Sequence, residues 1–331
     1  MAKANKVALT PEEKAQAKAK RRMQIKRDKW MYLLLLPGFL YFIIFKIVPM
    51  YGVLIAFKDY YAPSQFFGPG FSEFTKDWVG FENFRLFLTD SSFWMLLKNT
   101  LIISGMNIIF FFPLPIIMAL LLNEMKVQWY KKTIQTLVYV PHFVSMVVVF
   151  SITYVMLRAP AKEESGGAIY EIIKNLNGGQ GIDILQDKIA IYWVVLLQNV
   201  WKETGWGTII FLAALAGVDV EQYEAAIVDG ANRFQQLIYI TVPAIMGTVV
   251  TMLILRMGSV LNTGYEQLIL LKNSGNSDSI QTFDTYVYFQ GMQGGEYGYT
   301  TAVSLFKSII SIILIQSANA IAKRAGQEGL Y

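Results

Sequence analysis

The sequence contains no cysteine and a single histidine, His142. Without thiols it has no disulfide framework and no thiolate site. One histidine argues against a metal site built from histidines and against a Ser-His-Asp triad. No G-x-x-x-x-G-K-[ST] phosphate-binding loop is present either, so the chain carries no ATPase signature of its own. These absences remove much of enzyme chemistry, and we predict that the chain is not an enzyme.

Charged residues are also scarce. Asp, Glu, Lys and Arg make up 16% of the 331 residues, whereas 54% are hydrophobic. A soluble domain is nearer one quarter charged, so this composition indicates a membrane protein. Residues 1–29 hold ten Lys and Arg against three acids, directly before an apolar run. We interpret this basic arm as a cytoplasmic, membrane-facing flank rather than as a nucleic-acid-binding segment.

Long apolar segments dominate the rest of the chain. About 20 mostly apolar residues are needed to cross the hydrocarbon layer of a membrane. We therefore predict an all-α integral membrane protein whose residues 30–322 form six transmembrane helices, with no separate soluble domain and no tandem repeat. The expected spans are about 30–57, 95–122, 134–157, 189–216, 241–263 and 302–322. Residues 323–331 form a short tail.

The distribution of Lys and Arg predicts the orientation. With the N-terminus inside, the inside segments carry 16 of these residues and the outside loops carry eight. We expect a multi-pass protein of the cell membrane with both termini in the cytoplasm. The segment between the fourth and fifth spans then also faces the cytoplasm.

That segment contains "EAAIVDGANRFQQLIYITVP", residues 224–243, which is unusually polar for its position. Asp219 is placed to cap a helix, with Gln222 three residues later to reach back. Apolar residues then recur at helical spacing, and Gly230 interrupts the run. We predict two short helices joined by a glycine elbow. The polar face holds more acid than base, which suits a protein partner better than a lipid surface.

The spacing within this segment is specific. Glu224-Ala225-Ala226, three residues, Gly230, nine residues, then Ile240-x-Val242-Pro243 resembles the EAA loop of ABC importer permeases, with Val242 replacing the usual Leu. In that family the loop docks into the ATP-hydrolysing subunit. The resemblance implies that the coupling loop spans 219–243 and that its contact with the ATPase includes Glu224, Ala225, Ala226, Asp229, Gly230, Arg233 and Pro243.

Other stretches resemble one subfamily from about residue 26 to the end. They include "KRDKWMYLLLLPGFLYFIIFKIVPMYGVLIAFKDY" (27–60), "WKETGWGTIIFLAALAGVD" (201–219) and the closing "GQEGLY". They are similar to carbohydrate permeases of the maltose-transporter class, in the polysaccharide and aldouronate branch. The resemblance implies a type I ABC importer permease fold and import of oligosaccharides, including uronate-containing ones. It also implies a second permease, two ATPase subunits and an extracellular solute-binding lipoprotein as partners, with ATP and Mg bound by the ATPase and no cofactor in this chain.

Polar and ionisable groups inside spans are costly and mark candidate substrate paths. We place Arg256 well inside the fifth span. The candidate path residues are Gln198, Asn199, Trp201, Trp206, Arg256, Asn262 and Glu266. Other roles stay open: Arg256 as an ion-pair partner of Glu266 or of the second permease, Lys202 and Glu203 as an interhelical tie, and the tryptophans as plain packing. We expect His142 to be a hydrogen-bonded helix residue, and Lys98 and Lys307 to be structural or near-interface charges.

Two rival functions remain at this point. A permease for a non-sugar solute shares the EAA loop, and only the subfamily stretches argue against it. A secondary transporter normally brings more spans and internal repeats, and it needs no loop of this kind.

Overall fold

The computed structural model describes residues 20, 23–24, 27–60, 77–160, 165–327 and 329–330. Within these ranges every extended regular element is a helix, and the only strand-like pairing is an isolated bridge between Lys58 and Trp78. The all-α prediction is confirmed. Most of the basic arm lies outside the described residues. The contacts divide the chain into two units, residues 1–54 and residues 55–331, which are treated separately below.

The first unit is one apolar helical run. It contains α2 (Lys29–Phe42), the π-helical turn η1 (Ile43–Ile47) and the start of η2 (Val48–Phe57), which continues into the second unit. Together they form a 29-residue segment with a mean hydropathy of 2.1. Almost all of its apolar side chains are exposed in the chain by itself. Such a helix is stable in lipid or against another protein, but not in water.

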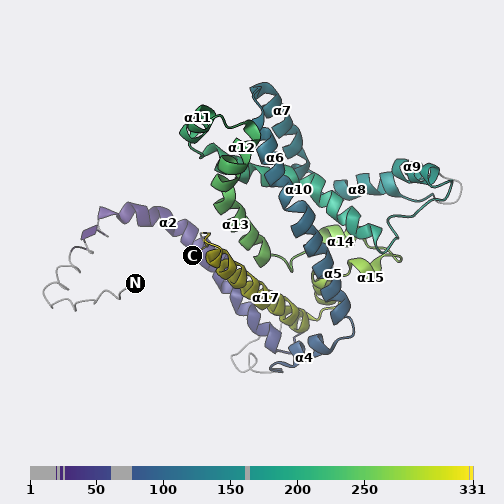
Figure 1. Cartoon of the computed structure of the whole chain (residues 1–331). Helices are drawn as coiled ribbons and strands as arrows, with labels where there is room; N and C mark the ends of the chain where they lie inside the picture. Colours follow the sequence, from purple (N-terminus) through teal and green to yellow (C-terminus); the bar gives the residue numbers. More distant parts are fainter. Residues whose placement is uncertain are drawn as a thin grey trace. The chain divides into compact units, whose positions relative to one another are not determined.

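The second unit is built entirely from helices within the part that the structure describes (Figure 1). In chain order they are α4 (Glu82–Thr89), α5 (Phe93–Met106), η4 (Asn107–Phe111), α6 (Pro113–Glu124), α7 (Gln128–Tyr139), η5 (Val140–Phe143), α8 (Met146–Leu157), α9 (Ala168–Leu176), α10 (Ala190–Ala216), α11 (Val220–Val228), α12 (Arg233–Gln236), η6 (Leu237–Thr241), α13 (Val242–Gly258), α14 (Glu266–Leu271), α15 (Ser277–Ile280), α16 (Phe283–Val287), η7 (Tyr288–Gln293) and α17 (Tyr297–Arg324).

The length and composition of these helices agree with the span prediction, with one change of shape. Four continuous runs are long and apolar enough to cross a membrane, and the number reaches six if each of two bent pairs is one span. The continuous runs are Lys29–Phe57, Phe93–Asn123, Arg233–Gly258 and Tyr297–Arg324. They correspond to the first, second, fifth and sixth predicted spans. α10 matches the fourth within one residue at its start.

The third predicted span, 134–157, is not one straight helix. The run Gln128–Phe143 meets α8 at an angle of 97°. Pro141 has no backbone N–H to continue the helical ladder, and the chain then becomes extended at Ser145, whose hydroxyl accepts from the backbone N–H of Val148 at 3.4 Å and caps α8. A proline followed by a new cap therefore breaks the predicted span in two.

The fifth span is displaced toward the N-terminus of its predicted range. α13 ends at Gly258 rather than at residue 263, so Arg256 lies in its last turn and not well inside it. At the other end the helix begins before the predicted residue 241, because α12 and the π-helical turn η6 lead directly into it. Pro243 would clash with the carbonyl four residues earlier in a regular helix, and the wider turn before it avoids that clash.

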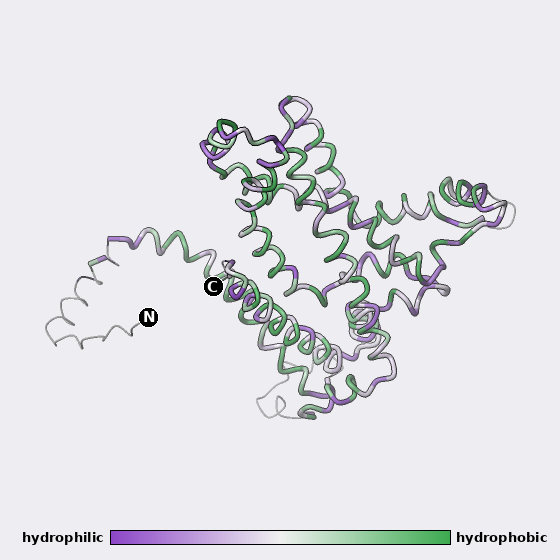
Figure 2. The backbone as a smooth tube through the Cα atoms, in the orientation of Figure 1, coloured by the Kyte–Doolittle hydropathy of each residue, from purple (hydrophilic) through white to green (hydrophobic). Residues whose placement is uncertain are grey.

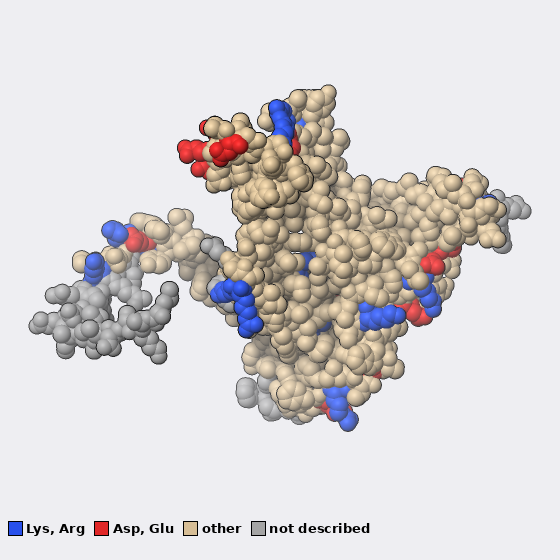
Figure 3. All heavy atoms as spheres, in the orientation of Figure 1, with Lys and Arg blue, Asp and Glu red and all other residues tan. Residues whose placement is uncertain are grey.

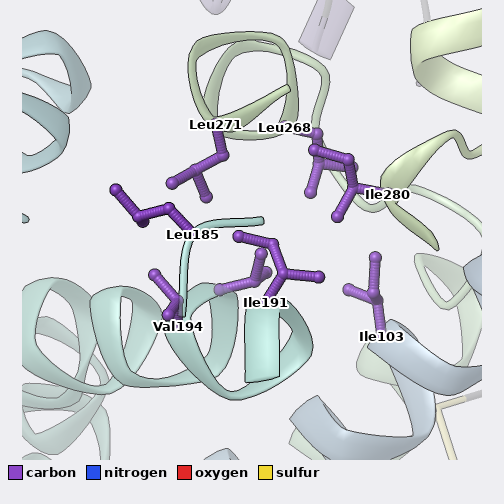
Figure 4. Packing of buried hydrophobic residues seen from close by; sticks show 8 residues of the cluster. Ile103, Leu185, Ile191, Val194, Leu268, Leu271 and Ile280 are labelled. Carbon is purple, nitrogen blue, oxygen red and sulfur yellow. The ribbon is translucent and has the colours of Figure 1, made fainter. Parts of the chain in front are cut away.

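Hydrophobic clusters hold the second unit together around α10. One cluster joins α5, α10, α14 and α15 through residues that include Ile103, Ile191, Leu268 and Ile280 (Figure 4). Another joins α6, α10 and α13 through Ala119, Phe211, Leu215 and Ile245. Figure 2 shows apolar residues along the long helices and hydrophilic residues over α11 and the adjoining turn. The start of α10 is capped by Asp187, and hydrogen bonds from the backbone N–H groups of Ala190 and Ile189 lower the pKa of that carboxyl.

A buried ion pair between α16 and α17 also binds the segment that follows α13, at residues 263–264. Lys307 of α17 is 7% exposed and pairs with Oδ1 of Asp284 in α16. Oδ2 of Asp284 accepts from the backbone N–H groups of Thr263 at 2.7 Å and Gly264 at 3.0 Å. Lys307 is thus a structural charge, one of the roles expected from the sequence.

Candidate functional site

The coupling loop is two short helices joined by a turn, as predicted. The carboxylate of Asp219 accepts from the backbone N–H of Glu221 at 3.0 Å and caps α11. The expected return contact from Gln222 is absent from the hydrogen bonds of the described loop. The reciprocal capping box lies instead at the second helix, where Asn232 and Gln235 each accept from the other's backbone N–H, at 2.8 and 2.9 Å. Each helix therefore has its own N-terminal cap.

Gly230 ends α11 in a Schellman motif. Its φ is +80°, its own N–H donates to the carbonyl of Ile227 at 3.0 Å, and the next N–H, of Ala231, donates to Ala226 at 2.9 Å. Glycine adopts this left-handed conformation without a Cβ penalty. A Cβ at this position would meet nothing within 4 Å in this chain. Glycine is therefore favoured here by the backbone conformation and not by crowding within the permease itself.

The exposed face of the loop combines acids with large apolar side chains. Asp219, Glu221, Glu224 and Asp229 are all exposed, and acidic atoms gather over α11 in Figure 3. Among them Val228 is 87% exposed, Phe234 71% and Ile227 61%. Neighbouring exposed apolar side chains on a polar loop mark a surface that another protein covers.

Contacts from the loop reach the spans directly. The hydroxyl of Tyr223 in α11 lies 3.0 Å from Oγ1 of Thr241, which is buried where the fifth span begins. Arg233 of α12 lies 3.9 Å from Glu124 at the end of α6. Pro243, the last predicted coupling residue, occupies the first turn of α13. These contacts join the loop directly to the start of the fifth span and to the end of α6.

A polar cavity lies between α5, η4, α10 and the end of α13. Its volume is about 390 Å³, within the usual range for ligand sites. Four of the seven predicted path residues line it: Asn199, Trp206, Arg256 and Asn262. We call it the translocation cavity, after the role that is proposed for it below.

The guanidinium of Arg256 is the principal charge of this cavity. It lies 5.9 Å from the centre of the Phe111 ring, a cation–π distance. Among the described residues it makes no ion pair, so the predicted alternative of a pair with Glu266 within this chain is wrong. An arginine that lines a polar cavity without a carboxylate partner is available to an anionic group that enters it.

A second charged residue that lines this cavity, Glu203, already has a partner. Oε2 of Glu203 lies 2.8 Å from Nδ1 of His142, and Lys202 donates to the carbonyl of His142 at 2.5 Å. The His142 ring stacks on Trp206 with 4.4 Å between centres. This cluster joins α10 to the break in the third span, so Lys202 and Glu203 form the interhelical tie that the sequence left open. His142 is the hydrogen-bonded residue expected there.

Three predicted path residues lie elsewhere. Gln198 is buried, donates to Thr153 at 2.8 Å and accepts from Gln267 at 2.9 Å, so it ties helices together. Trp201 lines apolar surface pockets. Glu266 is exposed at the start of α14.

The sequence-based prediction also missed polar residues on the cavity wall, namely Ser104, Asn107, Ser259 and Thr263. Ser104 and Asn107 line it from α5 and η4. They are polar, lie inside an apolar span and stand three residues apart, and this pattern by itself places them on one helix face. Asn107 accepts from Asn199 at 3.4 Å across the cavity wall.

Comparison with known proteins identifies relatives of this chain. Residues 111–327 match the family described as the binding-protein-dependent transport system inner membrane component. Protein LplB of Bacillus subtilis (strain 168) is 52% identical over 307 residues, which cover 93% of this chain and 92% of that protein. The polygalacturonan/rhamnogalacturonan transport system permease protein YteP of the same organism is 43% identical over 314 residues, with 94% of each chain covered.

Solved structures show the same fold. A chain of a bacterial alginate ABC transporter, in complex with an alginate pentasaccharide-bound periplasmic protein, superimposes with a TM-score of 0.80 at 32% identity, covering 93% of this chain and 99% of that chain. A second structure of a bacterial ABC transporter involved in alginate import gives a TM-score of 0.78. The importer permease fold is confirmed. The protein is a multi-pass membrane transport subunit and not an enzyme, and the chain belongs to the family of binding-protein-dependent transport system inner membrane components.

Proposed function

We propose that this chain is a permease subunit of an ATP-driven importer of oligosaccharides, including chains that contain uronate units. It forms the translocation path with a second, similar permease. An extracellular solute-binding lipoprotein delivers the sugar, and two ATPase subunits, which bind ATP and Mg, dock on the coupling loop. The observation that carries the acidic substrate class is Arg256 in the translocation cavity. Two relatives are named for the transport of polygalacturonan/rhamnogalacturonan and of alginate, and polygalacturonan and alginate are polymers of sugar acids.

The cavity offers the groups that a sugar acid needs. A guanidinium binds a carboxylate through parallel N–H donors. Asn199 and Asn262 provide amides that hydrogen-bond hydroxyl groups, and Trp206 provides an aromatic face for a sugar ring. The site is open and weakly charged, which suits passage of a substrate rather than tight retention.

Replacing Arg256 by Met is expected to leave the complex assembled and to lower uptake of acidic oligosaccharides about tenfold or more. The loss of a charge-assisted hydrogen bond to the sugar carboxylate is worth roughly 1.5–3 kcal/mol. Uptake of a neutral oligosaccharide of equal length should change much less. The measurement is ATPase activity stimulated by loaded binding protein, with uptake, in reconstituted vesicles. Arg256→Lys, which retains the charge but not the parallel N–H donors, is the matched control and should lose less activity than Arg256→Met.

Equal losses for acidic and neutral sugars would contradict the role of Arg256 in selecting acidic substrates while leaving oligosaccharide import intact. Failure of every oligosaccharide to stimulate the wild-type complex, with stimulation by an amino acid or a metal chelate, would overturn the proposed substrate class itself.

The proposed orientation places both termini and the coupling loop in the cytoplasm. Because the chain has no cysteine, single engineered cysteines report without background. In intact cells, Asn175→Cys and Ser274→Cys should react with a membrane-impermeant thiol reagent, whereas Gln128→Cys should react only after the membrane is opened. All three positions are exposed. Asn276, in the same loop as Ser274, is unsuitable because it is buried and donates to the carbonyls of Leu185 and Leu271. Reaction of Gln128→Cys with the impermeant reagent in intact cells would contradict the proposed orientation.

A further inference from the structure

A second cavity lies on another side of α5, away from the translocation cavity. It has a volume of about 750 Å³ and is lined by α5 from Trp94 to its last residue, Met106, by the start of α10 with the preceding Lys188, and by part of α15. Ile102 lines this cavity and Ser104 lines the translocation cavity. These residues are two positions, or about 200° of helix rotation, apart. The two cavities therefore use opposite faces of the same helix, and a ligand of one does not occupy the other.

One end of this second cavity is basic. Lys98 and Lys188 both line it and both are exposed. Lys188 lies 3.2 Å from Asp278, also on the wall, whereas Lys98 makes no ion pair within the described ranges. In Figure 3 basic and acidic atoms lie together on the part of the surface that carries α15. Counting Asp278, this end keeps a net positive charge.

Most of the remaining cavity wall is apolar and follows α5 inward, although Asn99, Tyr192 and Ser279 also line it. Met95, Ile102 and Met106 lie on the face of α5 that carries Lys98 and line the same cavity. From Trp94 to Met106 the helix rises about 18 Å, which approaches the length of an extended acyl chain. Trp94 and Trp193 stand near the first turns of α5 and α10, 74% and 48% exposed. Trp94 and Lys98 lie in the first two turns of α5, and tryptophan and lysine at one end of a membrane helix mark the boundary between headgroups and hydrocarbon. Trp193 instead packs on Phe110, beyond the other end of α5.

We propose that this cavity binds an anionic phospholipid such as phosphatidylglycerol. The phosphate lies between the ammonium groups of Lys98 and Lys188, and the acyl chains lie along Met95, Ile102 and Met106. A soluble sugar acid also carries the negative charge, but it would leave this long apolar wall in water. The amphipathic gradient from lysine to methionine along one helix face therefore favours a lipid. Bound here, the lipid fills the space between α5 and α10, the two helices that also form walls of the translocation cavity.

The test is native mass spectrometry of the detergent-purified transporter complex after delipidation and titration with phosphatidylglycerol or phosphatidylcholine. Wild-type complex should retain phosphatidylglycerol preferentially. Lys98→Ala/Lys188→Ala should lower that preference about tenfold to thirtyfold, since each basic residue near an anionic headgroup contributes roughly a factor of five. The matched control is Lys131→Ala/Lys132→Ala on α7, which removes the same charge away from the cavity and should bind lipid as the wild type does.

A second measurement uses the unmutated lysines, in case the double variant fails to assemble. Phosphatidylglycerol brominated on its acyl chains should quench tryptophan fluorescence at lower concentration than brominated phosphatidylcholine. Part of that quenching should disappear in Trp193→Phe. Equal binding of both lipids to the wild type, or displacement of phosphatidylglycerol by a trigalacturonate, would overturn the proposal. The second result would identify the cavity as a saccharide site instead. Neither result bears on the coupling loop or on Arg256, so the proposed transport function would stand.

Discussion

Gly230→Asp is expected to abolish transport while the permease remains folded in the membrane. Gly230 adopts φ +80° at the end of α11. Aspartate enters the left-handed region more readily than most residues, so the cost to the loop itself is about 1 kcal/mol. The larger effect arises at the docked surface. A carboxylate buried there without a partner costs several kcal/mol, which corresponds to a loss of binding of more than about a hundredfold.

Position 230 is exposed in this chain, so a charge added there would meet a docked partner. The side chain at position 230 would point into open space within this chain, next to exposed Val228 and Asp229. A partner that covers Val228 also covers position 230. The added charge would join the exposed acids Glu224 and Asp229 without a base beside it in the described part of the loop, except for Arg233 on the next helix. The permease would therefore lose its ATPase and stop transporting.

The measurement is recovery of ATPase subunits with detergent-solubilised permease, together with uptake. Gly230→Asn is the matched control, because it has the same size and tolerates the same backbone conformation but adds no charge. Its effect should be clearly smaller. Glu224→Ala should also be milder, since an exposed ion pair contributes at most about 1 kcal/mol. Wild-type ATPase recovery and uptake by Gly230→Asp would show that this loop is not the docking surface.

Removal of the buried ammonium group of Lys307 is expected to have the largest effect on stability. Lys307→Met leaves the Asp284 carboxylate charged and only partly compensated by the N–H groups of Thr263 and Gly264. Breaking a buried pair from one side costs about 3–5 kcal/mol. Thr263 and Gly264 also line the translocation cavity, so loosening them should lower transport together with the unfolding temperature.

Thermal unfolding of the purified permease pair tests this prediction. The double variant Lys307→Met/Asp284→Asn should recover much of the lost stability, because it removes the isolated charge. Arg85→Met serves as the control: it breaks a pair with Glu82 that is 2.7 Å long but solvent-exposed, and it should change little. If the single and double variants were equally unstable, size and packing rather than charge would explain the effect.

Sequence and tertiary structure contributed differently to the membrane spans, the coupling loop and the translocation cavity. Apolar length and the spacing of Glu224, Gly230 and Pro243 are local properties, so the sequence alone determined the all-helical membrane class and the permease family, and it predicted the two short helices at 219–243. The elbow at Gly230 was equally predictable, because a glycine that ends an amphipathic helix has few other conformations.

Which polar residues line a cavity and which bond to a neighbouring helix became known only from the tertiary structure. Arg256, Asn199 and Asn262 come together only when α10 packs beside the end of α13, whereas Gln198, one residue from Asn199, faces Thr153 and Gln267 instead. Adjacent residues on a helix point about 100° apart, and composition does not reveal which face meets a neighbour. The pairing of Lys307 with Asp284 depends likewise on the packing of α17 against α16. Local pattern therefore decided which helices form, and their packing decided which polar groups share a site.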